Sequence, residues 1–435
     1  MFKAPKYFGV FLILTSLSFF SIQANAVTEK GFKSLHIFTK VLNYLEENYV
    51  DEIDDQKVIQ GAISGMLRTL DPHTVYMSPE VFKELKVDTK GRFDGIGIEV
   101  AVRDNALTVI APIRGTPADK AGIEPGDVIV KIDGKFTENM DLTEAVTRLR
   151  GSRGSRVSLT ILREGNKKPF EFKILREPIN VPSVKYQVLD GNYGYVGISS
   201  FQEGTAKDLR KALKKLKDDD ALNGLVLDLR KNPGGLLDQT VDVSNLFLRK
   251  GVIVTTESRN QKKYQEEATV EGDKVDCPMV VLVDGGSASA SEIVAGALQD
   301  NKRAMILGTK TFGKGSVQTV IELDDGSALK LTVARYYTPS GRSIQAQGIE
   351  PDIIVPSKPP KIEDDKKQLR EESLAGHLEV PSEDKAEPVV KSKSDILEDD
   401  YQIRVALDYL KSWEVFKGDA SHKDAPRKKN AGKNK

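Results

Sequence analysis

The chain is poor in the residues that usually build disulfides and metal sites. A single cysteine, Cys277, excludes an intrachain disulfide and a cluster of cysteine ligands. The four histidines are His36, His73, His377 and His422, and none belongs to an HExxH-like spacing. We therefore expect neither a metal site nor an organic cofactor.

An excess of one charge is also missing. Lysine plus arginine number 64, and so do aspartate plus glutamate. This balance gives no reason to expect binding to nucleic acid or attraction to an anionic membrane surface. The 435 residues exceed what one hydrophobic core usually holds, so we expect two or three domains.

The N-terminus has the three-part layout of a secretory signal peptide. Lys3 and Lys6 precede an apolar run over residues 7–20, and the small-residue site Ala24-Asn25-Ala26 follows. The run is shorter than the roughly 20 residues that span a bilayer. We expect residues 1–26 to be cleaved and the protein to be exported to the periplasm. The alternative is an uncleaved anchor, which would keep the protein close to the membrane.

Amphipathic helices are expected at both ends of the chain. Within residues 27–92, apolar residues recur at helical spacing over 35–45 and again over 58–67. From residue 357 to 435 charged residues dominate, and such a tail cannot bury enough surface to fold. A short helix over 403–416 is the exception. The apolar faces favour a homo-oligomer, docking within the same chain, or an adaptor protein.

Residues 93–177 combine short strands with one helix, which is predicted over 142–149. Asp141 and Glu144 have the spacing of a capping box at the start of this helix. In FDGIGIEV, Gly95 and Gly97 let successive N–H groups turn toward a peptide carboxylate. The strands are expected at 107–111, 127–132 and 157–162.

Segment 115–134, GTPADKAGIEPGDVIVKIDG, strongly resembles the central signature of PDZ domains. The resemblance implies recognition of C-terminal or internal extended peptides, which would add as a strand beside the helix. A spacer that binds nothing is the alternative. The side chains expected to face the peptide are those of Ile96, Ile98, Leu142 and Val146.

Residues 178–356 alternate between strands and helices, which indicates parallel strands covered by helices. After Thr309 the pattern contains strands only, up to Tyr337. The fold class we expect is therefore multidomain, mixed α/β and β, with N-terminal helices, a PDZ domain and a mixed α/β core. The strands are expected at 194–198, 225–230 and 279–284, and the helices at 205–217, 236–248 and 289–299.

A serine in GGSASASE (285–292) is the first candidate catalytic residue. Ser289 follows a buried strand and opens a helix, whose free N–H groups could bind an oxyanion. The structural alternative is an ordinary capping box formed with Glu292. No histidine lies between residues 74 and 376, so a Ser-His-Asp triad would need His73, which reads instead as part of a helix stop and turn.

A lysine can replace histidine as the base. In GTKTFGKGSVQ (308–318), Lys314 stands between two glycines, and on an extended chain Lys314 and Gln318 project to the same side. A lysine base must be neutral, so its pKa must fall by roughly three units, about 4 kcal/mol, which requires burial. An ordinary surface lysine is the alternative.

These two motifs, together with LDLRKNPGG (227–235), closely resemble those of the C-terminal processing peptidases, also called tail-specific proteases. The resemblance runs from the N-terminal helices through the PDZ-like segment to about Pro356, and the three motifs occur in the family's order. It implies a serine endopeptidase that cleaves proteins near exposed C-termini and needs no cofactor.

The resemblance also implies the role of each site residue. Ser289 would be the nucleophile, Lys314 the general base, and Gln318 would assist the lysine. The backbone N–H groups of Gly235 and Ala290 would form the oxyanion hole. The alternatives are a PDZ scaffold with an inactive core and a trypsin-like PDZ protease, whose histidine and GNSGG-like motif are missing.

Overall fold

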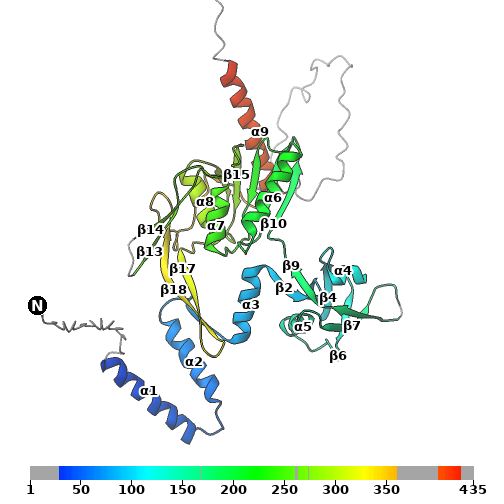
Figure 1. Cartoon of the computed structure of the whole chain (residues 1–435), viewed down its shortest axis with the longest axis vertical. Coiled ribbons are helices and arrows are strands. Elements are labelled where there is room, and N and C mark those ends of the chain that lie inside the picture. Colours follow the sequence, from blue (N-terminus) through cyan, green and yellow to red (C-terminus); the bar gives the residue numbers. More distant parts are fainter. Residues whose placement is uncertain (1–28, 167, 260–262, 273, 360–399, 423–435) are drawn as a thin grey trace, which may run out of the picture. The chain divides into compact units, whose positions relative to one another are not determined.

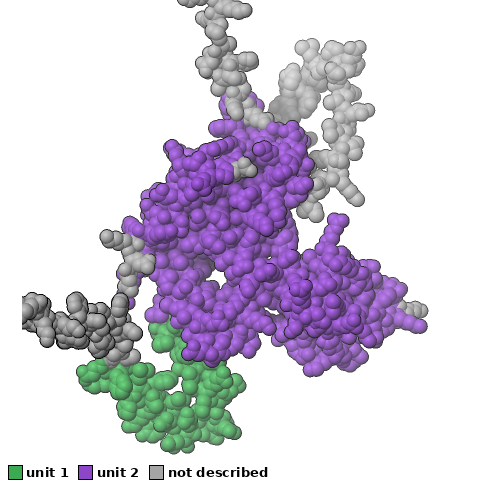
Figure 2. Space-filling view, viewed as in Figure 1, with its two compact units in different colours: residues 1–69 green, residues 70–435 purple. Residues whose placement is uncertain are grey.

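The computed structural model describes residues 29–166, 168–259, 263–272, 274–359 and 400–422. The expected signal peptide and most of the expected tail lie outside these residues. The chain divides into two compact units, residues 1–69 and 70–435 (Figure 2). None of the described helices is long and apolar enough to cross a bilayer.

The first unit contains the two predicted helices, α1 (Glu29–Asn48) and α2 (Asp55–Arg68). The side chain of Asp54 caps α2 by accepting the N–H of Lys57 at 3.1 Å. No residue of α1 is buried. Its apolar face therefore stays open within the described part of this unit.

The second unit begins with β1 (Val75–Met77) and α3 (Pro79–Lys90). Ser78 caps α3, and Gly91 ends it in the left-handed conformation, with φ at +62°. Strand β1 pairs with β18 (Ala328–Tyr337), far along the chain. Helix α3, which follows β1 directly, is thereby held beside the sheet that contains β18.

The PDZ region is built around a twisted antiparallel sheet in the order β3-β4-β5-β7-β8. Helix α5 forms over the predicted residues, Leu142–Leu149, because Asp141 accepts the N–H of Glu144 at 2.7 Å. Strand β3 is an edge strand of this sheet. The other elements are β2 (Arg92–Gly95), β3 (Ile98–Arg103), β4 (Ala106–Pro112), α4 (Pro117–Ala121), β5 (Val128–Ile132), β6 (Lys135–Phe136), β7 (Arg156–Leu162), β8 (Phe170–Leu175) and β9 (Glu177–Asn180).

The core contains the expected parallel sheet, in the order β10-β11-β12-β15-β16-β19, with only β10 antiparallel to its neighbour (Figure 1). The strands are β10 (Val184–Leu189), β11 (Tyr193–Ile198), β12 (Leu225–Asp228), β15 (Met279–Val283), β16 (Met305–Gly308) and β19 (Ile353–Ile354). The covering helices are α6 (Thr205–Asp218), α7 (Leu237–Asn245) and α8 (Ala290–Asp300).

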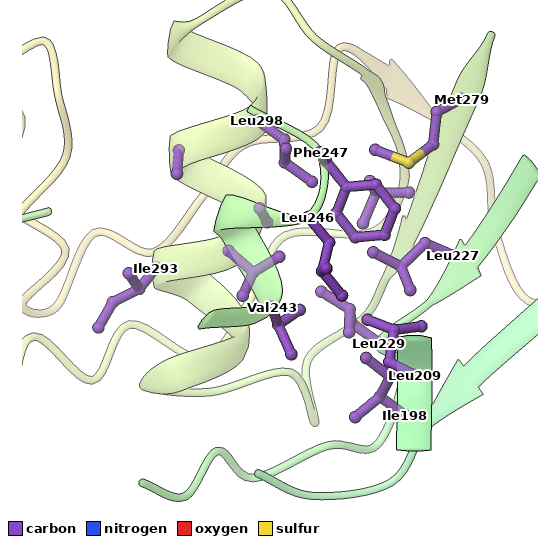
Figure 3. Packing of buried hydrophobic residues seen from close by; sticks show 14 of the residues in the cluster. Ile198, Leu209, Leu227, Leu229, Val243, Leu246, Phe247, Met279, Ile293 and Leu298 are labelled. Atoms are coloured by element: carbon purple, nitrogen blue, oxygen red, sulfur yellow. The ribbon is translucent and has the colours of Figure 1, made fainter. Parts of the chain in front are cut away.

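The two faces of this sheet bury alternate residues of each strand. Leu227 of β12 packs with Val243 and Leu298 of the helices α7 and α8 (Figure 3). Val226, the residue before it, faces the opposite side and packs with Leu407 of α9 (Tyr401–His422). The sheet is therefore covered on both faces, as a parallel sheet requires.

Docking of α9 resolves one alternative left open by the sequence, because this helix packs on the body of its own chain. Arg230, two residues after β12, donates to Asp228 and also to Asp400 and Gln402 at the start of α9, at 2.7 to 3.1 Å. Burial raises the pKa of the neighbouring Tyr195, whose hydroxyl donates to Asp228.

A second, antiparallel sheet joins β13 (Val252–Ser258), β14 (Tyr264–Glu267), β17 (Ser316–Glu322) and β18 to β1. Strands were predicted between Thr309 and Tyr337, and they form the β17–β18 hairpin, whereas strands β13 and β14 were not indicated by the sequence pattern. The multidomain α/β and β class predicted from the sequence is confirmed.

Candidate active site

Ser289 lies at the turn between strand β15 and helix α8, as the sequence predicts. Its backbone has φ at +54° and ψ at −109°, a conformation that a residue with a side chain adopts at a cost. Its exposed fraction is 9%. A strained, nearly buried serine at the start of a helix has the setting of a nucleophile.

Glu292 explains how this turn is held. Its side chain is fully buried, and its Oε2 atom accepts the N–H of Ser289 at 2.7 Å. The same oxygen accepts the N–H of Lys314 at 2.9 Å. The other oxygen accepts the hydroxyl of Thr311 and the N–H of Gly313, both at 2.6 Å. One buried carboxylate thus joins the two sequence motifs.

The segment around Gly235 approaches the same turn. Phe201 donates its N–H to the carbonyl of Gly234 at 2.9 Å, and its own carbonyl accepts the N–H of Leu236 at 2.7 Å. A Cβ atom at position 235 would lie 2.1 Å from the carbonyl oxygen of Phe201, so the position requires glycine. A Cβ atom at position 234 would lie 3.0 Å from the backbone nitrogen of Ala290.

Two backbone N–H groups near the serine turn remain without an acceptor among the described residues. Among the described residues, neither the N–H of Gly235 nor that of Ala290 donates a hydrogen bond. Gly235 lines the same cleft as Ser289, and Ala290 is the first residue of α8, where the helix dipole favours negative charge.

Asn232 is a positioning residue that the sequence analysis missed. It is fully buried, and its side chain donates to the carbonyl of Ile198 and accepts the N–H of Gly234, at 2.8 and 2.9 Å. Its backbone carbonyl accepts the N–H of Ala288 and the hydroxyl of Ser291, both at 2.9 Å. Asn232 therefore fixes the glycine loop against the serine turn.

Ser289 and Lys314 open into one cleft of about 700 Å³. Gln318 lines it too, but its amide nitrogen donates to the carbonyl and hydroxyl of Ser316, at 3.1 and 2.8 Å. Among the described residues, no hydrogen bond joins Gln318 to Lys314. Apolar walls of the cleft are supplied by Leu85, Phe201, Pro233, Leu236, Val317, Val320, Val333 and Tyr336.

The electrostatic setting of Lys314 favours its neutral form. Burial, and then the positive charge of Lys330, lower the pKa of Lys314, while Asp71 and Glu292 act in the opposite direction. His73 lies close enough for Lys314 to lower its pKa, after the larger effect of burial. As predicted, His73 stands in a turn, where its N–H donates to Asp71 at 2.7 Å.

The predicted PDZ site residues differ in how far they are exposed to solvent. Gly97 has φ at +79°, and a Cβ atom there would lie 2.4 Å from the side chain of Thr116, so only glycine fits. Leu142 is 40% exposed on α5, and Val146 is partly buried. Ile98 is partly buried on the edge strand β3, and Gly95 is buried.

Ile96 lies differently from the expectation. Its side chain is 1% exposed and belongs to the PDZ core with Val109 and Ile129. Only its backbone groups are therefore left for contact with a peptide. A buried core position is consistent with the sequence pattern, because alternating apolar residues do not show which face of a strand is covered.

The described residues contain no group of three or more His, Cys, Asp or Glu side chains that could hold a metal ion.

Comparison with known proteins identifies the family. The profile of peptidase family S41 matches residues 192–355, that of the PDZ domain matches 108–163, and that of the activating protease CtpB N-terminal domain matches 15–81. The carboxy-terminal-processing protease of Bartonella bacilliformis is 47% identical over 384 residues, 86% of this chain and 87% of that protein.

The carboxy-terminal processing protease CtpA of Bacillus subtilis is 40% identical over 335 residues, 77% of this chain and 71% of that protein. The solved photosystem II D1 C-terminal processing protease is 31% identical, covers 74% of this chain and 92% of its own, and has a TM-score of 0.44. The identity and coverage of the Bartonella and Bacillus proteins show that the chain belongs to peptidase family S41, with the carboxy-terminal processing proteases. It is a serine-type peptidase that acts on proteins and carries a PDZ domain.

Proposed function

We propose that Ser289 and Lys314 form a nucleophile–base dyad that cleaves peptide bonds through an acyl-enzyme. The observation that carries this proposal is the hydrogen bonding of both backbones to the same oxygen of Glu292. Because that carboxylate is buried and satisfied by four donors, it can hold the two residues in a fixed relation.

The steps follow from the surroundings of the two residues. Neutral Lys314 takes the hydroxyl proton of Ser289 as its oxygen attacks the substrate carbonyl. The developing oxyanion accepts the N–H groups of Gly235 and Ala290. Lys314 then gives the proton to the leaving amine, and water hydrolyses the acyl-enzyme with Lys314 again as the base. Gln318 would assist by orienting the lysine once its amide is released from Ser316.

The same proposal includes selection of substrate tails by the PDZ domain. The unpaired side of β3 can accept an added strand, and the backbone around Gly97 can receive a terminal carboxylate. The side chains of Ile98, Leu142 and Val146 would meet the peptide. Deleting residues 93–176 without any change in cleavage rate or selectivity would contradict this part.

We further propose that the protein is exported to the periplasm after removal of residues 1–26, and that it is a homo-oligomer. Support for export is the signal-like sequence. Support for self-association is the apolar face of α1, where Phe32, Leu35 and Phe38 are exposed within the described part of its unit. An adaptor protein and contact with a membrane are the competing uses of that face.

The test of the proposed function compares residues 27–435 with the same chain carrying Ser289→Ala. The substrate is an unfolded reporter protein with an apolar C-terminal tail. We expect cleavage by the first and loss of cleavage, with folding retained, in the second. Equal cleavage by both proteins would assign the activity to another nucleophile.

A further inference from the structure

A second hollow of about 490 Å³ lies apart from the catalytic cleft, and none of its lining residues lines that cleft. Helix α3, strand β2 and the loop after α5 form it. Asp94 is the one acidic residue of its lining. Five cationic residues line this hollow, here called the basic pocket: Lys83, Lys90, Arg92, Arg150 and Arg153.

Among the residues that the structure describes, these cations have no carboxylate partner. Within the ranges that the structure describes, none of the five forms an ion pair. The Nε atom of Arg150 is buried and has no hydrogen-bond partner there, while its guanidinium lies over the ring of Phe93 at 4.6 Å. Several like charges around one hollow repel one another, and a bound anion would relieve this repulsion.

Helix α3 separates the basic pocket from the catalytic cleft. Leu85, Asp88 and Thr89 line the cleft, and they stand three and four positions apart on one side of the helix. Lys83 and Lys90, seven positions apart on another side, line the basic pocket. The two hollows are therefore separated by the order of one helix diameter, about 10–12 Å.

An extended peptide advances about 3.3 Å per residue, so a substrate can reach both hollows with a segment of several residues. A polypeptide substrate offers carboxylates from Asp and Glu side chains and from its C-terminus. Several cations in one hollow fit a cluster of side-chain carboxylates better than one terminal group.

We propose that the basic pocket is an exosite for carboxylates of the polypeptide substrate, and that it favours substrates with an acidic segment near the cleaved bond. This inference rests on the proposed function, because it takes the cleft beyond α3 as the site of cleavage.

The experiment measures peptide binding so that it does not depend on activity. Fluorescent peptides are titrated into residues 27–435 carrying Ser289→Ala, with and without Lys83→Glu and Lys90→Glu. One peptide has an acidic segment and an amidated C-terminus. A second has Ser and Asn in place of the acidic residues, and a third adds a free C-terminus to this neutral sequence.

The control variant, Lys207→Glu with Lys215→Glu, changes the net charge equally on α6, where both side chains are exposed and outside the basic pocket. Fold integrity is checked from the thermal midpoint of each protein. The test variants should fold, because Lys83 and Lys90 are exposed and make no ion pair in the described structure.

We expect the affinity for the acidic peptide to fall about threefold to tenfold in the Lys83 and Lys90 variant, and not in the control, with a smaller difference at high salt. A fall confined to the peptide with a free C-terminus would overturn the preference for an acidic segment, because only the terminal carboxylate would then depend on Lys83 and Lys90. The proposal would be overturned if each peptide bound the Lys83 and Lys90 variant and the control variant with the same affinity.

A second assay measures binding of the same proteins to vesicles that contain anionic lipids. Vesicle binding that needs Lys83 and Lys90, without any peptide effect, would also overturn the proposal. Failure of the proposed function can be distinguished from failure of the exosite. In that case the chain with Ser289 intact would cleave none of the reporters, whereas the peptide-binding result would be unaffected.

Discussion

The N–H groups of Ser289 and Lys314 donate to the same oxygen atom, Oε2 of Glu292, at 2.7 and 2.9 Å. The two residues stand 25 positions apart and belong to different loops. Their shared acceptor is a fully buried carboxylate at the third position of helix α8. The relation between the two loops therefore depends on a residue that takes no direct part in the proposed proton transfer.

Replacing Glu292 by Gln tests this dependence. The amide has one acceptor oxygen, so either orientation turns an NH₂ group toward two backbone or hydroxyl donors. We expect a loss of stability of about 1–3 kcal/mol, as for a buried polar group left unsatisfied, and at least about tenfold lower kcat/KM. Thermal unfolding and reporter kinetics measure the two effects. Glu203→Gln, at an exposed carboxylate, is the control. Unchanged kinetics in Glu292→Gln would contradict the account.

The charge of Lys330 should shift the pH dependence of the reaction. Lys314 must be neutral to act as a base, so activity rises as pH rises through the pKa of Lys314, which lies below its ordinary value. Lys330 contributes to that lowering. In Lys330→Gln the pKa of Lys314 rises, and the kcat/KM profile moves to higher pH. Removing the opposing charge with Asp71→Asn should move it to lower pH, and shifts in one common direction would contradict the assignment.

A side chain at position 235 should disrupt the site because its Cβ atom would lie 2.1 Å from the carbonyl oxygen of Phe201. We expect Gly235→Ala to reduce kcat by at least about a hundredfold, the usual effect of losing an oxyanion donor. The matched control is Gly341→Ala. That glycine also has a positive φ, +84°, but no atom stands within 4 Å of the added Cβ. An equal loss of kcat in the two variants would show that backbone strain alone lowers the activity.

Helix α9 should contribute to the stability of the core. Leu410 is 3% exposed and packs against the parallel sheet, whereas Trp413 on the same helix is 57% exposed. We expect Leu410→Ala to cost about 2–5 kcal/mol and Trp413→Ala to change stability by less than about 0.5 kcal/mol. Denaturant unfolding measures both. A Trp413 variant as unstable as Leu410→Ala would mean that the outer part of α9 is covered.

Much of the local structure could be predicted from the sequence where a short-range signal was present. Helix α5 begins at Leu142 as expected because Asp141 supplies its cap. The serine turn and the glycine-flanked lysine likewise carry their signals within a few residues. The helix expected over 236–248 ends earlier, at Asn245. The predicted range was too long because no glycine or proline marks the end of this helix.

The remainder depends on contacts between distant residues. Glu292 has the spacing of a capping residue, and nothing nearby indicates that it also holds a loop 22 positions away. Asn232 joins three segments through its buried amide and carbonyl. Strand β13 pairs with β14 on one side and with the distant strand β18 on the other, and periodicity cannot reveal such long-range pairing.

The central claim is that Ser289 becomes acylated with Lys314 as its base. Its most direct test is an acid quench of residues 27–435 during turnover of a peptide ester, followed by mass spectrometry of the digested protein. The account predicts an acyl group on Ser289 in the unmodified chain, and none in the folded Lys314→Ala variant. An acyl group on a different residue, or equal acylation of Ser289 in both proteins, would contradict it.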